Sequence, residues 1–103
     1  MAAFRFSRRA EADLLSIGYT PRTWGSAQAA RYIGELEVCC QMLADNPALG
    51  RLCDDVRPRL RRLEHGKHVV FYRQERGGIL VSRILHRRML PDRHAIDDQD
   101  NEP

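Results

Sequence analysis

The sequence has no long hydrophobic run and little cysteine, and both shortages narrow the class of protein. No apolar stretch approaches the roughly 20 residues that a membrane-spanning helix needs. The opening residues, MAAFRFSRR, contain no apolar core of a secretory signal. Three cysteines, Cys39, Cys40 and Cys53, form an odd set without the CxxC spacing typical of zinc sites. We therefore expect a cytoplasmic protein with reduced thiols, no bound metal and no cofactor.

The motifs of common enzyme classes are also missing. The sequence has no carboxylate pair, glycine-rich phosphate loop, nucleophile elbow or metal-ligand spacing. Its four histidines and many arginines leave an RNA-cleaving site conceivable, because that chemistry needs a base, an acid and cations around the phosphate. His68 and His86 could be the titrating pair if strand register brought them to one face. The simpler interpretation makes His68 a hydrogen-bonded strand residue.

Positive charge is concentrated in one stretch of the chain. The net charge over 103 residues is only +3, but residues 57–88 carry ten Lys and Arg against two acids. The chain after Met89 carries one Arg against five acids. A region with so many positive charges attracts phosphates or an acidic protein segment. The alternative interpretation is a basic surface that contacts only solvent.

The same stretch predicts an antiparallel β-meander, preceded by two helices. β-branched and aromatic residues dominate 68–72 and 79–85, and glycines between the runs suit hairpin turns. Ser7 is a good N-cap for a first, short helix. A second helix is predicted from Ser26 to a stop at Asp45, because apolar residues recur there at three- and four-residue steps.

The order β-α-α-β-β-β predicts an α+β two-layer domain over residues 1–96, in which an N-terminal edge strand and an αα-hairpin pack on the C-terminal meander. Residues 51–56 are expected to be a connecting loop, and the acidic residues 97–103 a disordered tail. The expected structural residues are Leu14, Trp24, Tyr32, Leu36 and Phe71.

Apolar residues are expected on both faces of the meander. Strict alternation groups Val81 with Leu85 on one face and Leu80 with Ile84 on the other. Because one helical layer covers only one face, the other face should be covered by the C-terminal tail or by a partner.

Four pieces of the sequence, in order and spacing, carry a resemblance to a known family. They are AEADL at 10–14, WGSAQA at 24–29, NPALG at 46–50, and GKHVVFYR at 66–73 running into RILHRRM at 83–89. Together they resemble a ParE-type plasmid-stabilisation toxin of the RelE/ParE superfamily, over roughly residues 4–95.

The resemblance implies the toxin of a type II toxin–antitoxin system. ParE-type toxins are understood to inhibit DNA gyrase by binding it, without catalysis, and to be neutralised by a ParD-type ribbon-helix-helix antitoxin. The protein would then contact nucleic acid only indirectly, through gyrase or the antitoxin. The antitoxin is expected to cover the helix hairpin and the meander face, with contacts at Arg59, Arg61, Arg62, Tyr72 and Arg83. Gyrase inhibition is expected to depend on Arg83, His86, Arg87, Arg88, Met89, Arg93 and His94.

Two alternatives remain open. RelE-type relatives are ribosome-dependent mRNA endoribonucleases, and the residues that would serve that role here are His68, Arg83, Arg88 and His94. No tyrosine follows Tyr72, so the RelE-like set is incomplete. A non-toxic nucleic-acid-binding module is the third interpretation, supported only by the basic stretch.

Overall fold

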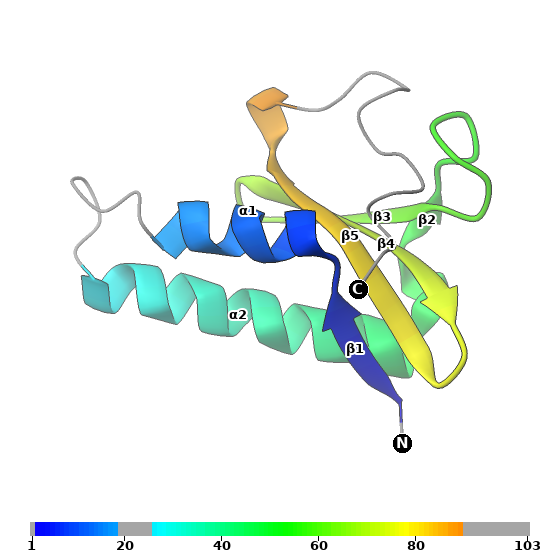
Figure 1. The fold of residues 1–103 in the computed structure, drawn as a ribbon, viewed down its shortest axis with the longest axis horizontal. Helices are drawn as coiled ribbons and strands as arrows, with labels where there is room; N and C mark the ends of the chain where they lie inside the picture. Colours follow the sequence, from blue (N-terminus) through cyan, green and yellow to red (C-terminus); the bar gives the residue numbers. More distant parts are fainter. Residues whose placement is uncertain (1, 19–25, 90–103) are drawn as a thin grey trace.

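The chain forms one sheet with two helices beside it, in a computed structural model that describes residues 2–18 and 26–89. Figure 1 shows α1 and α2 lying side by side next to the strands. The elements in chain order are β1 (Ala3–Phe6), α1 (Arg8–Gly18), α2 (Ser26–Asp45), the 3₁₀ turn η1 (Pro47–Leu49), β2 (Arg51–Leu52), β3 (Arg61–His65), β4 (His68–Glu75), β5 (Gly78–His86) and the 3₁₀ turn η2 (Arg87–Met89).

The five strands are ordered β1-β5-β4-β3-β2. Strands β3, β4 and β5 form the predicted antiparallel meander, and β1 is the predicted edge strand, paired in parallel with β5. The prediction of a loop over 51–56 was wrong at its start, because Arg51 and Leu52 pair with Arg62 and Arg61 of β3. The α+β architecture is confirmed.

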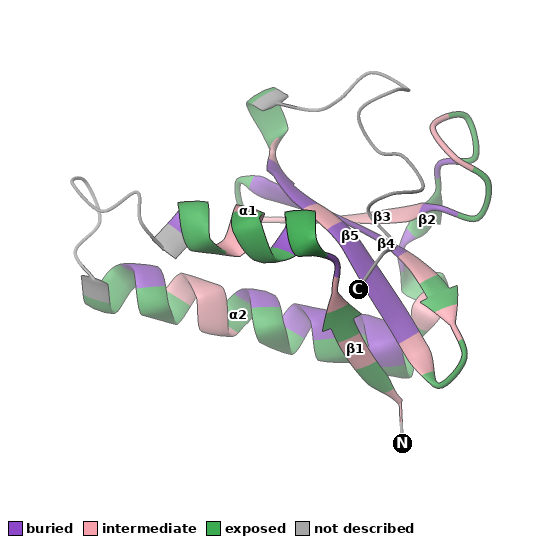
Figure 2. Cartoon of the chain, in the orientation of Figure 1, coloured by how far each residue is buried: buried purple, intermediate pink, exposed green. Residues whose placement is uncertain are grey.

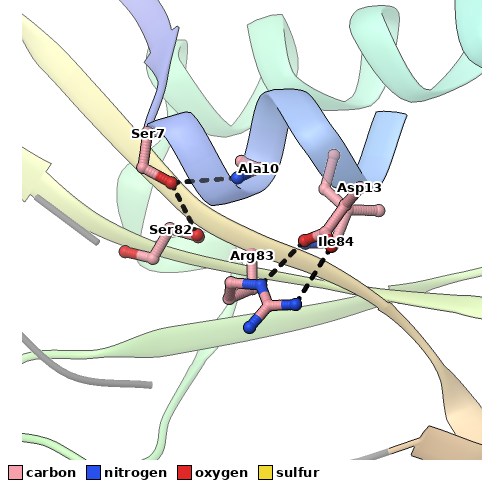
Figure 3. A network of polar contacts seen from close by, with 6 residues as sticks. All are labelled: Ser7, Ala10, Asp13, Ser82, Arg83 and Ile84. Carbon is pink, nitrogen blue, oxygen red and sulfur yellow. Dashed lines mark hydrogen bonds and ion pairs between the residues drawn. The ribbon is translucent and has the colours of Figure 1, made fainter. Parts of the chain in front are cut away.

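The predicted N-cap and helix stop are both present. The Ser7 hydroxyl accepts a hydrogen bond from the backbone N–H of Ala10 (3.0 Å) and donates one to the carbonyl oxygen of Ser82 (2.8 Å), as Figure 3 shows. Helix α2 ends at Asp45, ahead of Asn46 and Pro47. Ser7 therefore fixes the start of α1 and attaches it to β5.

One face of the sheet packs against both helices. The buried residues of this cluster come from α1, α2, β4 and β5, and Figure 2 shows β5 buried along most of its length. They are Ala10, Ile17, Leu36, Cys39, Cys40, Leu43, Ala44, Val70, Tyr72, Ile79, Val81 and Ile84.

A β-bulge in β5 changes which residues share a face. Phe71 pairs with Arg83, but the next residue of β4, Tyr72, pairs with Val81, so Ser82 is the extra residue. Val81 and Ile84 both belong to the helix-side cluster. The predicted grouping of Val81 with Leu85 was therefore wrong, because it assumed unbroken alternation.

The face of the sheet turned away from the helices, here called the second face, has a smaller apolar cluster of its own. Val69, Phe71 and Leu85 pack there with Cys53, Val56 and Leu60 of the β2–β3 connection. Both faces are thus apolar, as predicted. The prediction that the C-terminal tail or a partner covers the second face was wrong for this part of it, because the connection between β2 and β3 covers these residues.

Candidate interaction site

An apolar groove of about 600 Å³ runs between α2 and the edge of β3. Its floor includes Leu63 and Cys39, and its outer side carries Val38 and Met42, which are 71% and 45% exposed. The full lining, here called the α2–β3 groove, is Arg31, Gly34, Glu35, Val38, Cys39, Met42, Leu63, Glu64 and His65. Val38 and Met42 are one helical turn apart, so α2 presents a second apolar stripe outside the core.

The backbone edge of β3 lies along this groove. Three consecutive residues, Leu63 to His65, line it, although successive side chains of a strand point to opposite faces. Strand β4 pairs with β3 along one edge, whereas on the other edge β2 pairs only with Arg61 and Arg62. Within the described residues no strand therefore pairs with this outer edge of β3 from Leu63 to His65. An open edge of this kind presents backbone donors and acceptors to an added segment.

A cluster of aromatic and imidazole rings lies at the end of the groove. The Tyr32 hydroxyl donates to the carbonyl oxygen of His65 (3.1 Å), and the Tyr32 hydroxyl oxygen lies 2.6 Å from Nδ1 of His68. His65 Nε2 is 3.7 Å from a carboxylate oxygen of Glu35. Because the Tyr32 hydroxyl donates its single proton to the His65 carbonyl oxygen, it can only accept a hydrogen bond from His68, so Nδ1 of His68 is the protonated, donating nitrogen.

Strand register also places the two candidate catalytic histidines together. His68 pairs directly with His86, and their ring centroids are 5.3 Å apart. Burial, followed by the neighbouring His86 and His65, lowers the pKa of His68. The side chain of His68 is enclosed, so the structure supports the hydrogen-bonded strand residue that the simpler interpretation expected.

Arg83, a candidate in all three predicted sets, is held by α1 (Figure 3). Its Nε and Nη2 atoms donate to the two carboxylate oxygens of Asp13 at 2.9 and 3.0 Å. The same carboxylate accepts the backbone N–H of Ile84 at 2.9 Å. Arg83 therefore has a structural role, because it holds α1 against β5.

The arginines of the β2–β3 region are only partly committed to internal contacts. Arg61 donates to the carbonyl oxygen of Gly50 (2.6 Å), and Arg62 donates to Glu64 (2.9 Å) and lies over the Phe71 ring. Arg59 is exposed in the connection, at a positive φ of 66°. Along the chain, these residues precede Leu63, the first residue of β3 that lines the groove.

Tyr72 does not fit its predicted role as a partner contact. The side chain has no exposed surface. Its hydroxyl donates to the carbonyl oxygen of Pro47 (2.6 Å) and accepts the backbone N–H of Gly50 (2.7 Å). Tyr72 therefore anchors η1 inside the fold, and we remove it from the contact set.

The predicted C-terminal determinants begin where β5 ends. Arg87 and Arg88 are exposed in η2, and the backbone N–H of Arg88 donates to Nδ1 of His86 (3.1 Å). Met89 is the last residue of η2. Trp24, Arg93 and His94 lie outside the described residues.

The remaining predicted structural residues lie in the two clusters. Leu36 is fully buried on the helix side, and Leu14 and Tyr32 pack against the same cluster. Phe71 belongs to the cluster on the second face. Among residues 2–18 and 26–89, no group of three or more His, Cys, Asp or Glu could hold a metal ion. No helix in that part of the chain is long and apolar enough to cross a bilayer.

Sequence reasoning missed the α2–β3 groove. The predicted stripe of α2 faced the core and left out Val38 and Met42. Two large apolar residues one turn apart outside that stripe were the available signal.

The fold is shared with a known toxin–antitoxin assembly. A chain of the structure described as the chromosomal ParDE TA system from P. aeruginosa superposes with a TM-score of 0.65, covering 84% of this chain and 96% of that chain at 22% identity. At that identity the match shows the fold.

Sequence comparison identifies the family. The family model described as the ParE toxin of the type II toxin-antitoxin system parDE matches residues 4–91. Toxin ParE1 of Caulobacter vibrioides is 42% identical over 92 residues, covering 86% of this chain and 93% of that toxin. Toxin ParE1 of Mycobacterium tuberculosis is 46% identical over 72 residues (69% and 74%), and Toxin ParE of Escherichia coli is 40% identical over 91 residues (86% and 88%). The chain belongs to the ParE toxin family of type II toxin–antitoxin systems.

Proposed function

We propose that this protein inhibits DNA gyrase in the cytoplasm by binding it, catalyses no reaction itself, and is neutralised by a ParD-type ribbon-helix-helix antitoxin. Membership of the ParE toxin family supports the toxin role. The α2–β3 groove supports a protein partner, because it combines exposed apolar side chains with an open strand edge.

The antitoxin segment is assigned to the α2–β3 groove. An amphipathic segment would bury Val38 and Met42, and its backbone would add to the edge of β3. Acidic side chains on the same segment would meet Arg59, Arg61 and Arg62, which precede the groove residues of β3 along the chain. The apolar contacts would supply most of the affinity, and the charges would fix the orientation.

The gyrase-binding surface is assigned to the end of β5 and η2. His86, Arg87, Arg88 and Met89 are the described residues of this surface, and both arginines are exposed. This surface is built by β5 and η2, whereas the groove is built by α2 and β3. Variants of one surface can therefore be tested without touching the other.

The experiment combines the purified protein with gyrase, supercoiled plasmid and ATP, with and without a ParD-type antitoxin. Accumulation of linear, protein-linked DNA that the antitoxin abolishes is the expected result. Unchanged gyrase activity at a protein concentration in large excess over gyrase would overturn the proposal.

A second candidate function, ribosome-dependent mRNA cleavage, is favoured by one observation, the 5.3 Å approach of His68 and His86. Arg83, a third member of that predicted set, is instead bound to Asp13. Cleavage of mRNA on translating ribosomes, lost on His68→Gln substitution, would support this function in place of gyrase inhibition.

A further inference from the structure

Two arginines stand close together on the second face of the sheet. Arg62 on β3 pairs with Phe71 on β4, whose side chain lies in the second-face cluster. Arg73 follows two residues later on β4 and therefore points to the same face. The two arginines are diagonal cross-strand neighbours, a spacing that long side chains bridge.

Both guanidinium groups have an unused donor. The Nε atoms of Arg62 and Arg73 are buried, and no acceptor among the described residues reaches either one. Arg62 donates to Glu64 only through Nη2. A buried N–H without an acceptor is costly, and the Nε edge of a guanidinium is the part that forms two-point contacts with a carboxylate.

The face around them has the chemistry of a carboxylate site. Arg73 pairs with Leu80, and Leu80 pairs on its other side with Arg5 of β1. Arg5 is already bound to Glu75. Across this face, the apolar Leu80 therefore lies between Arg73 and the Arg5–Glu75 pair. An acidic segment lying here would contact Arg62 and Arg73.

The chain carries such a segment within reach. Residues 97–102 hold four acids, Asp97, Asp98, Asp100 and Glu102, and no basic residue. The path back along β5 from His86 to Leu80 covers six residues, or about 20 Å. Residues 90–96, fully extended, span up to about 25 Å. The segment from Asp97 onward can therefore reach the level of Arg73.

We propose that the acidic segment 97–102 docks in cis on the second face, where its carboxylates accept hydrogen bonds from the partly exposed guanidinium groups of Arg62 and Arg73. The inference does not depend on gyrase inhibition. The short connection gives the segment an effective concentration in the millimolar range, so it competes with acidic partners and with phosphates for this face. The α2–β3 groove, which does not include Arg62, stays open to the antitoxin, and the segment competes with acidic side chains of the antitoxin only for Arg62.

A paramagnetic label at position 99 of the full chain tests the proposal. Gln99→Cys introduces a thiol for labelling, whereas Cys39, Cys40 and Cys53 are buried. Burial raises the pKa of the Cys40 thiol to about 12 and that of Cys53 to about 11, so both react slowly. In ¹⁵N spectra, the Nε–H signals of Arg62 and Arg73 are expected to broaden strongly beside the label. Raising the salt toward 1 M, where the Debye length is about 3 Å, should restore them.

Matched variants separate charge recognition from proximity. Neutralising the segment (Asp97→Asn, Asp98→Asn, Asp100→Asn, Glu102→Gln) should remove the broadening. Arg73→Lys should weaken the broadening, because lysine keeps the positive charge but lacks the planar guanidinium that donates two parallel hydrogen bonds to a carboxylate. Arg76→Lys, an exposed arginine in the β4–β5 turn, is the control and should leave it unchanged.

Three results would overturn the proposal. The first is no broadening on the second face, or broadening centred on the α2–β3 groove. The second is broadening that survives neutralisation of the segment. The third is equal broadening when labelled unenriched protein is mixed with unlabelled ¹⁵N protein, which would assign the contact to a second copy of the chain.

Discussion

Asp13 and Arg83 form a two-point ion pair that joins α1 to β5 across 70 residues of sequence. The side chains are only 14% and 20% exposed, respectively. Asp13 also accepts the N–H of Ile84, just past the bulge at Ser82, where β1 no longer pairs with β5. One carboxylate therefore completes the edge of β5 and fixes α1 against it (Figure 3).

Substitution of Asp13 by Ala should lower the free energy of unfolding by about 2 to 4 kcal/mol, because it leaves Arg83 and the Ile84 N–H without their acceptor. Urea denaturation measures the loss. The matched control is Glu75→Ala, which breaks the Arg5–Glu75 pair, also 70 residues apart. That pair is more exposed, at 47% and 27%, so its loss should cost below about 1 kcal/mol. Equal costs for the two variants would contradict the structural role of Asp13.

Gly50 and Tyr72 make a second testable contact. A Cβ at position 50 would collide with the Tyr72 hydroxyl and lie 2.8 Å from the carbonyl oxygen of Arg62. Gly50→Ala should therefore destabilise the fold by about 1 to 3 kcal/mol. Tyr72→Phe removes the hydroxyl that meets Pro47 and Gly50 and should cost about 1 to 2 kcal/mol.

The double variant of Gly50 and Tyr72 distinguishes the two causes. Because Tyr72→Phe removes the atom that the new Cβ would strike first, the combined loss measured in urea should be smaller than the sum of the single losses. Strict additivity would show that the collision is not with the hydroxyl.

Stability should fall as the solution is acidified, and His68 should be part of the cause. Its pKa is lowered in the folded state, chiefly by burial; the neighbouring His86, His65 and Lys67 act in the same direction, and Asp13 acts in the opposite direction. The unfolded chain, with His68 near its ordinary pKa of about 6.5, then binds more protons than the folded chain. The contribution of neutral His68 is present above about pH 6.5 and is lost as the pH falls through the folded-state pKa.

Urea denaturation of the wild type and of His68→Gln at about pH 7.5 and about pH 5.5 measures this effect. The pH dependence of the unfolding free energy should be smaller in the variant. Tyr32→Phe controls for loss of the Tyr32–His68 hydrogen bond alone, since it removes the hydroxyl and keeps the imidazole. An identical pH dependence in wild type and His68→Gln would contradict the assignment.

Local signals predicted most of the fold. Ser7 as N-cap, the stop after Asp45 and the glycine turns of the meander each depend on residues close in sequence. The resemblance in 4–95 supplied the family, which the match over 4–91 confirms.

The features that the sequence did not predict are long-range. The bulge at Ser82 depends on what packs on each side of β5, and the Asp13–Arg83 pair depends on how α1 meets that strand. The groove required knowing that Val38 and Met42 lie beside the edge of β3. Each depends on tertiary placement, which apolar periodicity does not encode.

Charge in the groove should block antitoxin binding. Val38→Asp and Met42→Lys each place a charged group where an apolar partner surface would be buried, and each should weaken the affinity for a ParD-type antitoxin at least about tenfold. Leu15→Asp is the matched control, because Leu15 is 60% exposed on α1 and is not among the groove residues. Titration calorimetry measures all three. A loss for Leu15→Asp as large as that for Val38→Asp would move the antitoxin site to the α1 side.

Reversing the charges of η2 should separate toxicity from neutralisation. Arg87 and Arg88 are exposed at the end of β5, so Arg87→Glu with Arg88→Glu should leave the urea midpoint and the antitoxin affinity near wild type. The gyrase cleavage assay should lose most of its linear DNA, because a complementary gyrase surface would now meet like charge. The control, Arg8→Glu with Arg76→Glu, changes the net charge equally at two exposed sites outside η2 and should stay inhibitory. Equal loss in both pairs would mean that overall charge, and not this turn, determines the effect on gyrase.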